Sequence, residues 1–180
     1  MPATERAFSD PPPGRLYLDT DILINYVLSS ELHHRRASTF LEGLLAHDTM
    51  LCLSSITWVE YAHVLTRDDF RRRLPQEIRQ RFQLDGWSDP AVRQQYLQEH
   101  VRALEELLAQ FEWLEVFPLA EVRRAALALM AQYNLDGQDA IHLASASSQG
   151  VVDFASFDHV YRRVDELILW NDLIYAGQPT

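Results

Sequence analysis

Short apolar segments alternate with helical patterns along most of this 180-residue sequence, and this alternation constrains the fold more than any other feature. The segments 16–18, 50–53, 113–117, 151–155 and 167–170 have the length and composition of buried strands. Between them, apolar residues recur every three or four positions, as on the buried face of a helix. Strands that alternate with helices form right-handed crossovers, so the sequence predicts a three-layer α/β/α domain with a central parallel sheet of about five strands.

Two regions depart from this alternation. Residues 1–14 contain no apolar stretch typical of a signal peptide, and we expect them to form a flexible N-terminal tail before a single domain over 15–175. Residues 67–100 are polar and contain Leu74-Pro75 and Asp89-Pro90. This pattern predicts one or two short helices in an insertion outside the core.

Composition limits the class of protein. The longest apolar run, 125–131, is far shorter than the ~20 residues that span a bilayer, so no membrane segment is expected. The single cysteine, Cys52, cannot form an internal disulfide, which is typical of a protein of the reducing cytoplasm. The net charge is -10 and all 16 basic residues are arginine. A nucleic acid would therefore have to be held by a local basic patch or by bound cations.

Acidic residues follow the predicted strands. Asp19 and Asp21 come directly after the first strand, and Asp158 follows the fourth strand after a short turn. Glu60 lies in the helix after the second strand, and Asp139 in the first turn of a later helix. Sites in an open parallel sheet form beyond the C-terminal ends of the strands, so these carboxylates could meet at one edge.

Glu60 is the hardest of these acids to explain by stability alone. Its helical neighbours at i-4 and i+4 are Ile56 and Val64, so it lies on an apolar stripe. An ionised carboxylate there loses several kcal/mol of hydration unless it is paired. His63 at i+3 is one candidate partner, and a metal ion is another.

The remaining acids also have structural explanations. Asp136 and Asp139 could be a capping pair at the start of a helix. Asp158 could be a first-turn acid after a Ser156 cap, and Asp21 an N-cap or first-turn acid.

Convergence would distinguish a site from separate helix caps. Two carboxylates about 4 Å apart repel by ~4 kcal/mol at a partly buried dielectric. If Asp19, Glu60, Asp139 and Asp158 met, they would have to take up protons or bind a hard divalent cation. The sequence has no Cys/His cluster with ligand spacing, so Mg²⁺ or Mn²⁺ fits better than zinc.

Four segments resemble the motifs of PIN-domain ribonucleases, and they occur in the order found in that family. They are Tyr-Leu-Asp-Thr-Asp-Ile-Leu-Ile at 17–24, Ser-Ser-Ile-Thr-Trp-Val-Glu at 54–60, Asp-Ala-Ile-His-Leu-Ala-Ser-Ala at 139–146 and Ala-Ser-Phe-Asp at 155–158. The sequence looks most like the VapC-type toxins of toxin–antitoxin pairs. The resemblance implies a PIN-like fold and a Mg²⁺- or Mn²⁺-dependent endoribonuclease that cuts single-stranded or loop RNA.

The resemblance also implies roles for individual residues. Asp19 and Asp139 would be the main metal ligands, and Glu60 and Asp158 would complete the catalytic acidic pocket, directly or through water. Ser156 would supply a supporting hydroxyl group. Family members often form homodimers and are blocked by a small antitoxin protein that covers this pocket.

The chain departs from the family pattern in two respects. Asp21 stands where many members have an uncharged polar residue, which could alter metal affinity. The stretch between Glu60 and Asp139 is longer than in compact members, which leaves substrate choice and antitoxin docking open.

The hydrolysis implied by the resemblance needs a metal-activated water and no protein nucleophile. This agrees with the absence of any Ser-His or Cys-His arrangement in the sequence. His142 follows Asp139 by three residues, and we expect it to pack or to form a hydrogen bond. The His33-His34 pair is expected at the surface.

RNA contact is the hypothesis for the segment 67–81. It contains six arginines and three acids, so its local charge is +3. Arg71, Arg72 and Arg73 would contact the RNA backbone, and neighbouring phenylalanines could stack on bases. The alternative is a solvated helical face without a ligand.

Two other functions stay open from the sequence. Asp19-Thr20-Asp21 also resembles the Asp-x-Asp signature of haloacid dehalogenase-type phosphohydrolases, in which Asp19 would be the nucleophile and Asp21 the acid/base. Those enzymes use a basic residue, usually lysine, and a downstream Gly-Asp-x-x-x-Asp element, and this sequence has neither a lysine nor that element. The second is a non-catalytic PIN-like module that only binds a partner.

Overall fold

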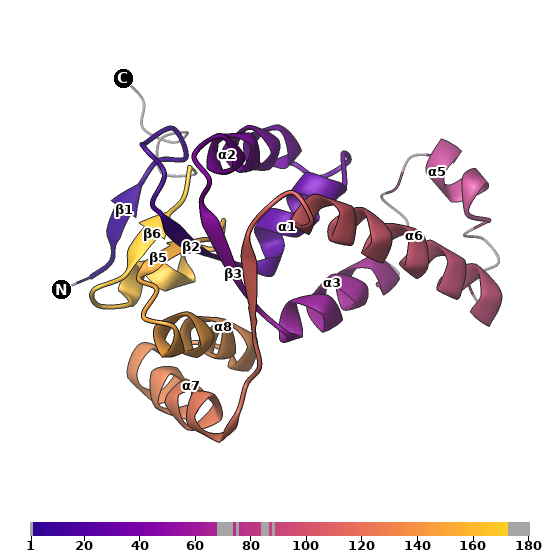
Figure 1. Ribbon diagram of the computed structural model, residues 1–180. Coiled ribbons are helices and arrows are strands. Elements are labelled where there is room, and N and C mark those ends of the chain that lie inside the picture. Colours follow the sequence, from indigo (N-terminus) through magenta and orange to yellow (C-terminus); the bar gives the residue numbers. More distant parts are fainter. Residues whose placement is uncertain (1, 68–73, 75, 84–86, 88, 173–180) are drawn as a thin grey trace.

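The computed structural model describes residues 2–67, 74, 76–83, 87 and 89–172. Its described strands form one parallel sheet of six, in the order β1-β6-β5-β2-β3-β4 (Figure 1). The strands are β1 Thr4–Arg6, β2 Arg15–Leu18, β3 Met50–Ser54, β4 Trp113–Val116, β5 Asp153–Ala155 and β6 Ile168–Trp170. The predicted three-layer architecture is confirmed, with one more strand than expected.

Helices cover both faces of the sheet (Figure 1). They are α1 Thr20–Val27, α2 His34–Ala46, α3 Ile56–Thr66, α5 Gln76–Arg81, α6 Pro90–Leu108, α7 Ala120–Tyr133 and α8 Gly137–Ser148, with a 3₁₀ helix, η2, at His159–Arg163. Leu16 and Leu18 join the core formed with α1, α2, α3 and α6. Tyr17, between them, joins the second core, with α7, α8 and η2. Successive side chains of β2 thus point to opposite faces, and both faces are buried.

The expectation of a flexible tail over residues 1–14 needs correction. Thr4–Arg6 forms β1, which pairs in parallel with β6 in the register Thr4 to Ile168. The next residues are also fixed, because the Phe8 ring stacks on Phe40 with 4.0 Å between ring centroids. The strand was missed because Thr, Glu and Arg on an edge strand lack the apolar pattern of a buried strand.

The segment 67–100 was expected to lie outside the core, and this is also corrected. Leu74, Phe82 and Tyr96 are buried in the same core as α1, α2 and α3. The Phe82 and Tyr96 rings meet edge to face at 5.0 Å. Helix α6 continues without a break past residue 100, so the expected boundary there is absent.

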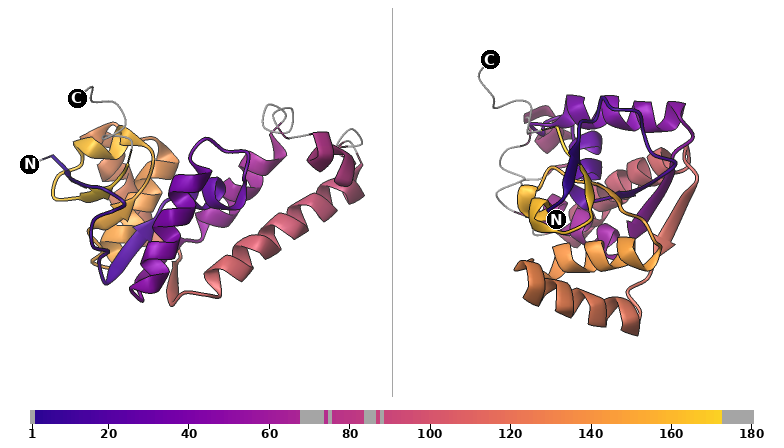
Figure 2. Two further views of the ribbon diagram at one scale, coloured as in Figure 1. Left: turned by 90° about the horizontal axis from the view of Figure 1, so that it is seen from above. Right: turned by 90° about the vertical axis from the view of Figure 1, so that its left-hand side faces the viewer.

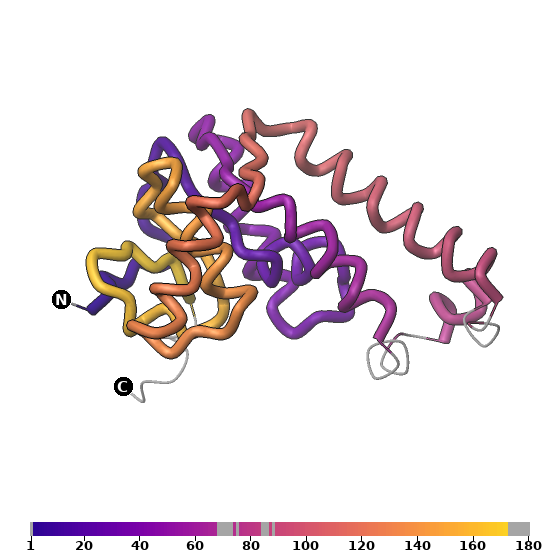
Figure 3. Tube along the Cα trace, turned by 90° about the horizontal axis from the view of Figure 1, so that it is seen from below, coloured from indigo at the N-terminus to yellow at the C-terminus, as the bar shows by residue number. Residues whose placement is uncertain are grey.

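Helix α6 gives the molecule its elongated shape. It begins at the cap Asp89, whose side chain accepts a hydrogen bond from the Ala91 amide, and Pro90 occupies the first turn. From this cap, at the end of the molecule where α5 lies, the helix runs back to the sheet and leads into β4 (Figures 1, 2 and 3).

A membrane-spanning helix is absent from the described part of the chain. Helix α6, at 19 residues, is long enough to cross a bilayer, but it carries Arg93, Glu99 and Arg102 among other charged residues. The free cysteine, Cys52, is buried in β3.

Candidate metal centre

Asp19 is held rigidly where β2 ends and α1 begins. It caps α1, because its Oδ1 accepts a hydrogen bond from the Thr20 amide at 2.7 Å. Its Oδ2 accepts a hydrogen bond from the Ser156 hydroxyl at 2.8 Å. The Asp19 amide donates to the Ala155 carbonyl at 3.0 Å, which fastens it to β5. The residue is 7% exposed, so this carboxylate is fixed and largely removed from solvent.

Asp21 lies in the first turn of α1 and ties that helix to the loop after β5. Its Oδ2 accepts a hydrogen bond from the Phe157 amide at 2.8 Å and lies 3.1 Å from the Ser156 hydroxyl oxygen. The single Ser156 proton is therefore within reach of both Asp19 and Asp21. The other Asp21 oxygen, Oδ1, is buried without a hydrogen-bond partner among the described residues.

Glu60 has a buried partner that the sequence did not indicate. Its Oε2 is 2.6 Å from Nε2 of His142 and accepts a hydrogen bond from the Thr20 hydroxyl. His142 is 1% exposed, and its Nδ1 is 2.8 Å from the Tyr17 hydroxyl. The hydrogen-bonding role expected for His142 is confirmed, and the partner of Glu60 is His142 instead of His63.

His142 also lies close to a second carboxylate, that of Asp19, which sequence reasoning missed. Its Nε2 is 3.7 Å from Oδ1 of Asp19. The available signal was its spacing, since residues three apart on α8 share a helix face with Asp139.

Asp139 and Asp158 serve the local structure and the site together. Asp136 caps α8 by accepting hydrogen bonds from the Gln138 and Asp139 amides, both at 2.9 Å. The Asp139 carboxylate accepts a hydrogen bond from the Tyr161 hydroxyl at 3.2 Å. Asp158 caps η2 through the Val160 amide at 2.8 Å. The cap expected at Asp136 is confirmed, whereas Asp158 is itself the cap of η2 and not a first-turn acid after a Ser156 cap. Neither role excludes a site.

The acids from four separate motifs line one cavity of about 300 Å³. They are Asp19 and Asp21 at α1, Glu60 on α3, Asp139 on α8 and Asp158 at η2. The rest of the lining consists of Thr20, Ile24, His63, Val64, Arg67, Gln138 and His142. The predicted convergence at the C-terminal edge of the sheet is thus observed. Arg71, Arg72 and Arg73 lie outside the described residues.

Burial and mutual repulsion disfavour the ionised form of these carboxylates and so raise their pKa values. Burial, aided by the Glu60 charge, raises the pKa of Asp19, although His142 and Ser156 act in the opposite direction. Burial and then the Asp19 charge raise the pKa of Asp21 well above its usual value. Burial, followed by the neighbouring carboxylates, raises the pKa of Asp139 to about 6.

For His142, in contrast to the carboxylates, the surroundings favour the charged form. Its burial lowers its pKa, but the hydrogen bond to Glu60 and the charges of Asp19, Glu60 and Asp139 outweigh burial, so the net pKa is raised. The raised pKa favours the protonated imidazole, which would place a positive charge against Glu60.

The donor atoms fit a divalent cation. One ligand atom from each of Asp19, Glu60 and His142 lies within 4.8 Å of the others. Several hard carboxylate oxygens suit Mg²⁺ or Mn²⁺. The His142 nitrogen is compatible with Mn²⁺ only after the imidazole has lost its proton. The unpartnered Oδ1 of Asp21 is a further oxygen without a compensating proton donor. A cation would supply the charge that the raised carboxylate pKa values show to be missing.

Comparisons with known proteins agree with this fold. The family model described as PIN domain matches residues 16–167. Among solved structures, VapBC2 from Rickettsia felis, bound to a DNA fragment from their promoter, has a TM-score of 0.56 at 16% identity, covering 87% of this chain and 98% of that one. PAE2754 from Pyrobaculum aerophilum has a TM-score of 0.52 at 19% identity, covering 95% of this chain and 96% of that one. At these identities the likeness is one of fold. No curated protein matches the sequence significantly.

Proposed function

This chain belongs to the PIN domain family, whose members are generally nucleases, and we propose that it is a Mg²⁺- or Mn²⁺-dependent endoribonuclease. The observation that carries the proposal is the meeting of Asp19, Glu60, Asp139 and Asp158 in one cavity. Four acids from distant parts of the chain are costly to bring together, and a bound cation removes that cost. Single-stranded or loop RNA is the proposed substrate.

Asp19 and Asp139 would hold the metal, with Glu60 and Asp158 contributing directly or through water. When bound, such a cation polarises a phosphate oxygen and lowers the pKa of a bound water toward neutrality. The Ser156 hydroxyl and the Thr20 amide orient the two Asp19 oxygens, and the Tyr161 hydroxyl orients Asp139. These hydrogen bonds fix the ligands before the metal arrives.

Asp139 links metal binding to pH. With its pKa raised to about 6, it carries a proton in mildly acidic solution when no cation is present. Metal binding then has to displace that proton. At neutral pH the carboxylate is mostly ionised and ready to bind.

The structure offers no support for the haloacid dehalogenase alternative. Both oxygens of Asp19 already accept hydrogen bonds, so this side chain is built as an anchored ligand. The PIN domain model spans the Asp-x-Asp segment as well as the downstream motifs.

The likeness to VapBC2 supports a second part of the proposal. The chain would be the toxin of a toxin–antitoxin pair of the cytoplasm, with a small antitoxin protein that covers the acidic cavity. A homodimer is the assembly expected from the family resemblance.

Incubation of the protein with total RNA, with and without Mn²⁺, followed by mapping of the cut ends, tests the nuclease. We expect cleavage only with the metal, and loss of cleavage in D19N and D139N variants that retain the native circular dichroism spectrum. Cleavage in the presence of a chelator, or full activity of either variant, would refute the proposal. Metal binding without cleavage of any RNA would favour the non-catalytic module.

A further inference from the structure

A group of basic side chains begins α2, close to the acidic cavity. His33 caps the helix, and His34, Arg35 and Arg36 form its first turn, with no acidic residue there and no side-chain cap. Cations are disfavoured at a helix N-terminus because the helix dipole is positive there. The stability of α2 therefore does not explain these arginines.

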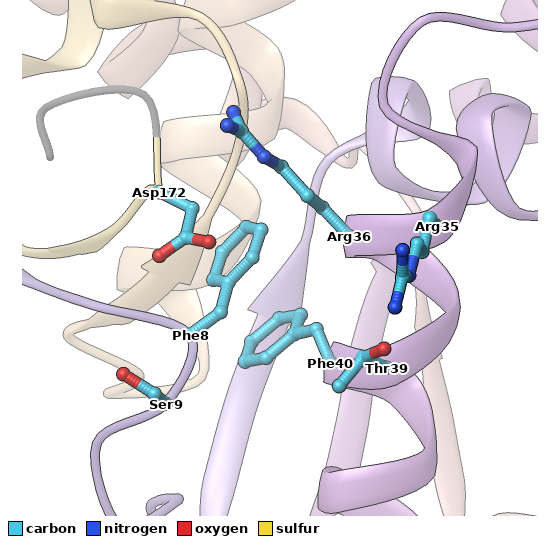
Figure 4. A pocket seen from close by; sticks show the side chains of 7 residues that line it. All are labelled: Phe8, Ser9, Arg35, Arg36, Thr39, Phe40 and Asp172. Atoms are coloured by element: carbon cyan, nitrogen blue, oxygen red, sulfur yellow. The ribbon is translucent and has the colours of Figure 1, made fainter. Parts of the chain in front are cut away.

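Arg35 and Arg36 border a second cavity, which lies between α2 and the segment after β1 (Figure 4). Its volume is about 260 Å³. The rings of Phe8 and Phe40 line it and stack on each other at an interplanar angle of 13°. Ser9, Thr39 and Asp172 complete the lining.

The charge of this cavity is opposite to that of the chain. Neither Arg35 nor Arg36 takes part in the salt bridges found between described residues. Asp172 is the single carboxylate in the lining, against two guanidinium groups. An anion is therefore favoured here, although the net charge of the protein is -10.

Aromatic contacts connect the two cavities. The Phe8 ring meets the Phe157 ring edge to face at 5.4 Å, and Phe157 also stacks on His33 at 4.6 Å. The Phe157 amide donates to Asp21, and the next residue, Asp158, lines the acidic cavity. Phe157 and Asp158 thus lie between the acidic cavity and the cavity lined by Phe8 and Phe40. A single extended ligand could therefore reach both cavities.

We propose that the cavity between Phe8 and Arg36 binds one nucleotide of a single-stranded RNA, flanking the phosphodiester at the acidic cavity. The guanidinium groups of Arg35 and Arg36 bind a phosphate, for which the arginine fork is well matched. The base lies against Phe8, because aromatic side chains stack on bases without strong sequence preference. This inference rests on the proposed function, since it takes RNA to be the substrate.

The test measures RNA binding by fluorescence anisotropy, with a labelled short single-stranded RNA and a chelator to prevent cleavage. The R35Q/R36Q variant is compared with R123Q/R124Q, which removes two consecutive exposed arginines from the first turns of α7 on the other face of the sheet. We expect about a tenfold weaker affinity for R35Q/R36Q, and a salt dependence flatter by about 0.7 logarithmic units per decade, equal to one lost phosphate contact. The α7 variant should bind as the unmodified protein does.

Phe8→Leu separates stacking from charge. It keeps an apolar side chain but removes the ring, so the affinity should fall about fivefold while the salt dependence stays the same. Phe117→Leu is the control, because Phe117 is 60% exposed on another part of the surface. Thermal unfolding verifies that each variant is folded.

Equal losses in the α2 and α7 variants, or no loss in either, would overturn the inference. Unchanged RNA affinity together with loss of binding to a polyglutamate peptide in R35Q/R36Q would overturn it in favour of an acidic protein partner. The nuclease proposal is judged separately, because binding is measured without metal. A protein that binds RNA through Arg35 and Arg36 but never cleaves it would refute only the nuclease proposal.

Discussion

His142 Nε2 lies 2.6 Å from Oε2 of Glu60, although 82 positions separate the two residues. This contact joins α8 to α3 across the end of the sheet, and the Tyr17 hydroxyl fixes the imidazole from its other side. The side chains are 1% and 12% exposed, so the pair is largely removed from water. Glu60 is therefore oriented in the acidic cavity by its hydrogen bonds to His142 and Thr20.

Breaking this pair should remove a hydrogen bond to the largely buried Glu60 carboxylate, which then keeps the one from the Thr20 hydroxyl. We expect His142→Ala to lower the free energy of unfolding by about 3 kcal/mol, because the largely buried Glu60 carboxylate loses a hydrogen-bond partner. Urea unfolding measures the effect, with His47→Ala as the control, since the ring of the exposed His47 contacts only its own helix. The E60Q/H142A double variant should lose less than the sum of the single variants, and strict additivity would contradict the coupling.

Asp139→Asn should abolish cleavage and yet stabilise the metal-free protein. The ionised Asp139 is destabilised in the fold, because its pKa is raised to about 6 from a usual value of 3.8. After allowance for its partial exposure, we expect a gain of about 1 kcal/mol at neutral pH. The gain should vanish near pH 4, where the folded protein keeps the Asp139 proton.

The sign of this effect follows from proton binding. Between the two pKa values the folded state binds more protons at Asp139 than the unfolded state, so its contribution to stability falls as the pH rises through this window. A gain that persisted unchanged at low pH would show that lost carboxylate repulsion is not its cause.

Metal affinity should decrease in mild acid. Protons compete with the cation for Asp139 below its pKa of about 6, so Mn²⁺ binding should be about threefold or more weaker near pH 5.5 than near pH 7.5. Titration calorimetry measures the affinity directly and does not depend on catalysis. In D139N the residual binding should vary less with pH, and an equal pH dependence in both proteins would contradict this account.

Ser156→Ala should weaken metal binding without unfolding the protein. The hydroxyl is fully buried and lies within hydrogen-bond distance of both Asp19 and Asp21. Loss of such a supporting contact reduces metal affinity by roughly tenfold or more. Ser148→Ala is the matched control, because that exposed hydroxyl bonds only within its own helix and to the adjacent Gln149. Equal metal affinity of the two variants would argue against a supporting role for Ser156.

The features of the site that depend on short stretches of sequence could be predicted. Leu16, Tyr17 and Leu18 are apolar because both faces of β2 are buried, so the strand and the acid that follows it were recognisable. The convergence of the acids then followed from the parallel topology.

The remaining features depend on contacts that local patterns do not encode. β1 has only three residues, and its edge position does not require an apolar pattern. The burial of Tyr96 depends on Phe82, which precedes it by fourteen positions in a polar segment. The pairing of His142 with Glu60 depends on how two helices meet, and spacing along the chain cannot specify that contact.

The pairing of β1 with β6 makes the two ends of the described chain mutually dependent. Thr4 donates its amide to the Leu167 carbonyl at 2.8 Å, and Asn171 donates to the carbonyl of Arg6 at 2.9 Å. Fraying from either end would release the same border of the sheet, so amide hydrogen exchange should report both ends as one opening unit. Because β5 lies between β6 and β2, this local opening would leave β2, the strand that precedes Asp19, in place.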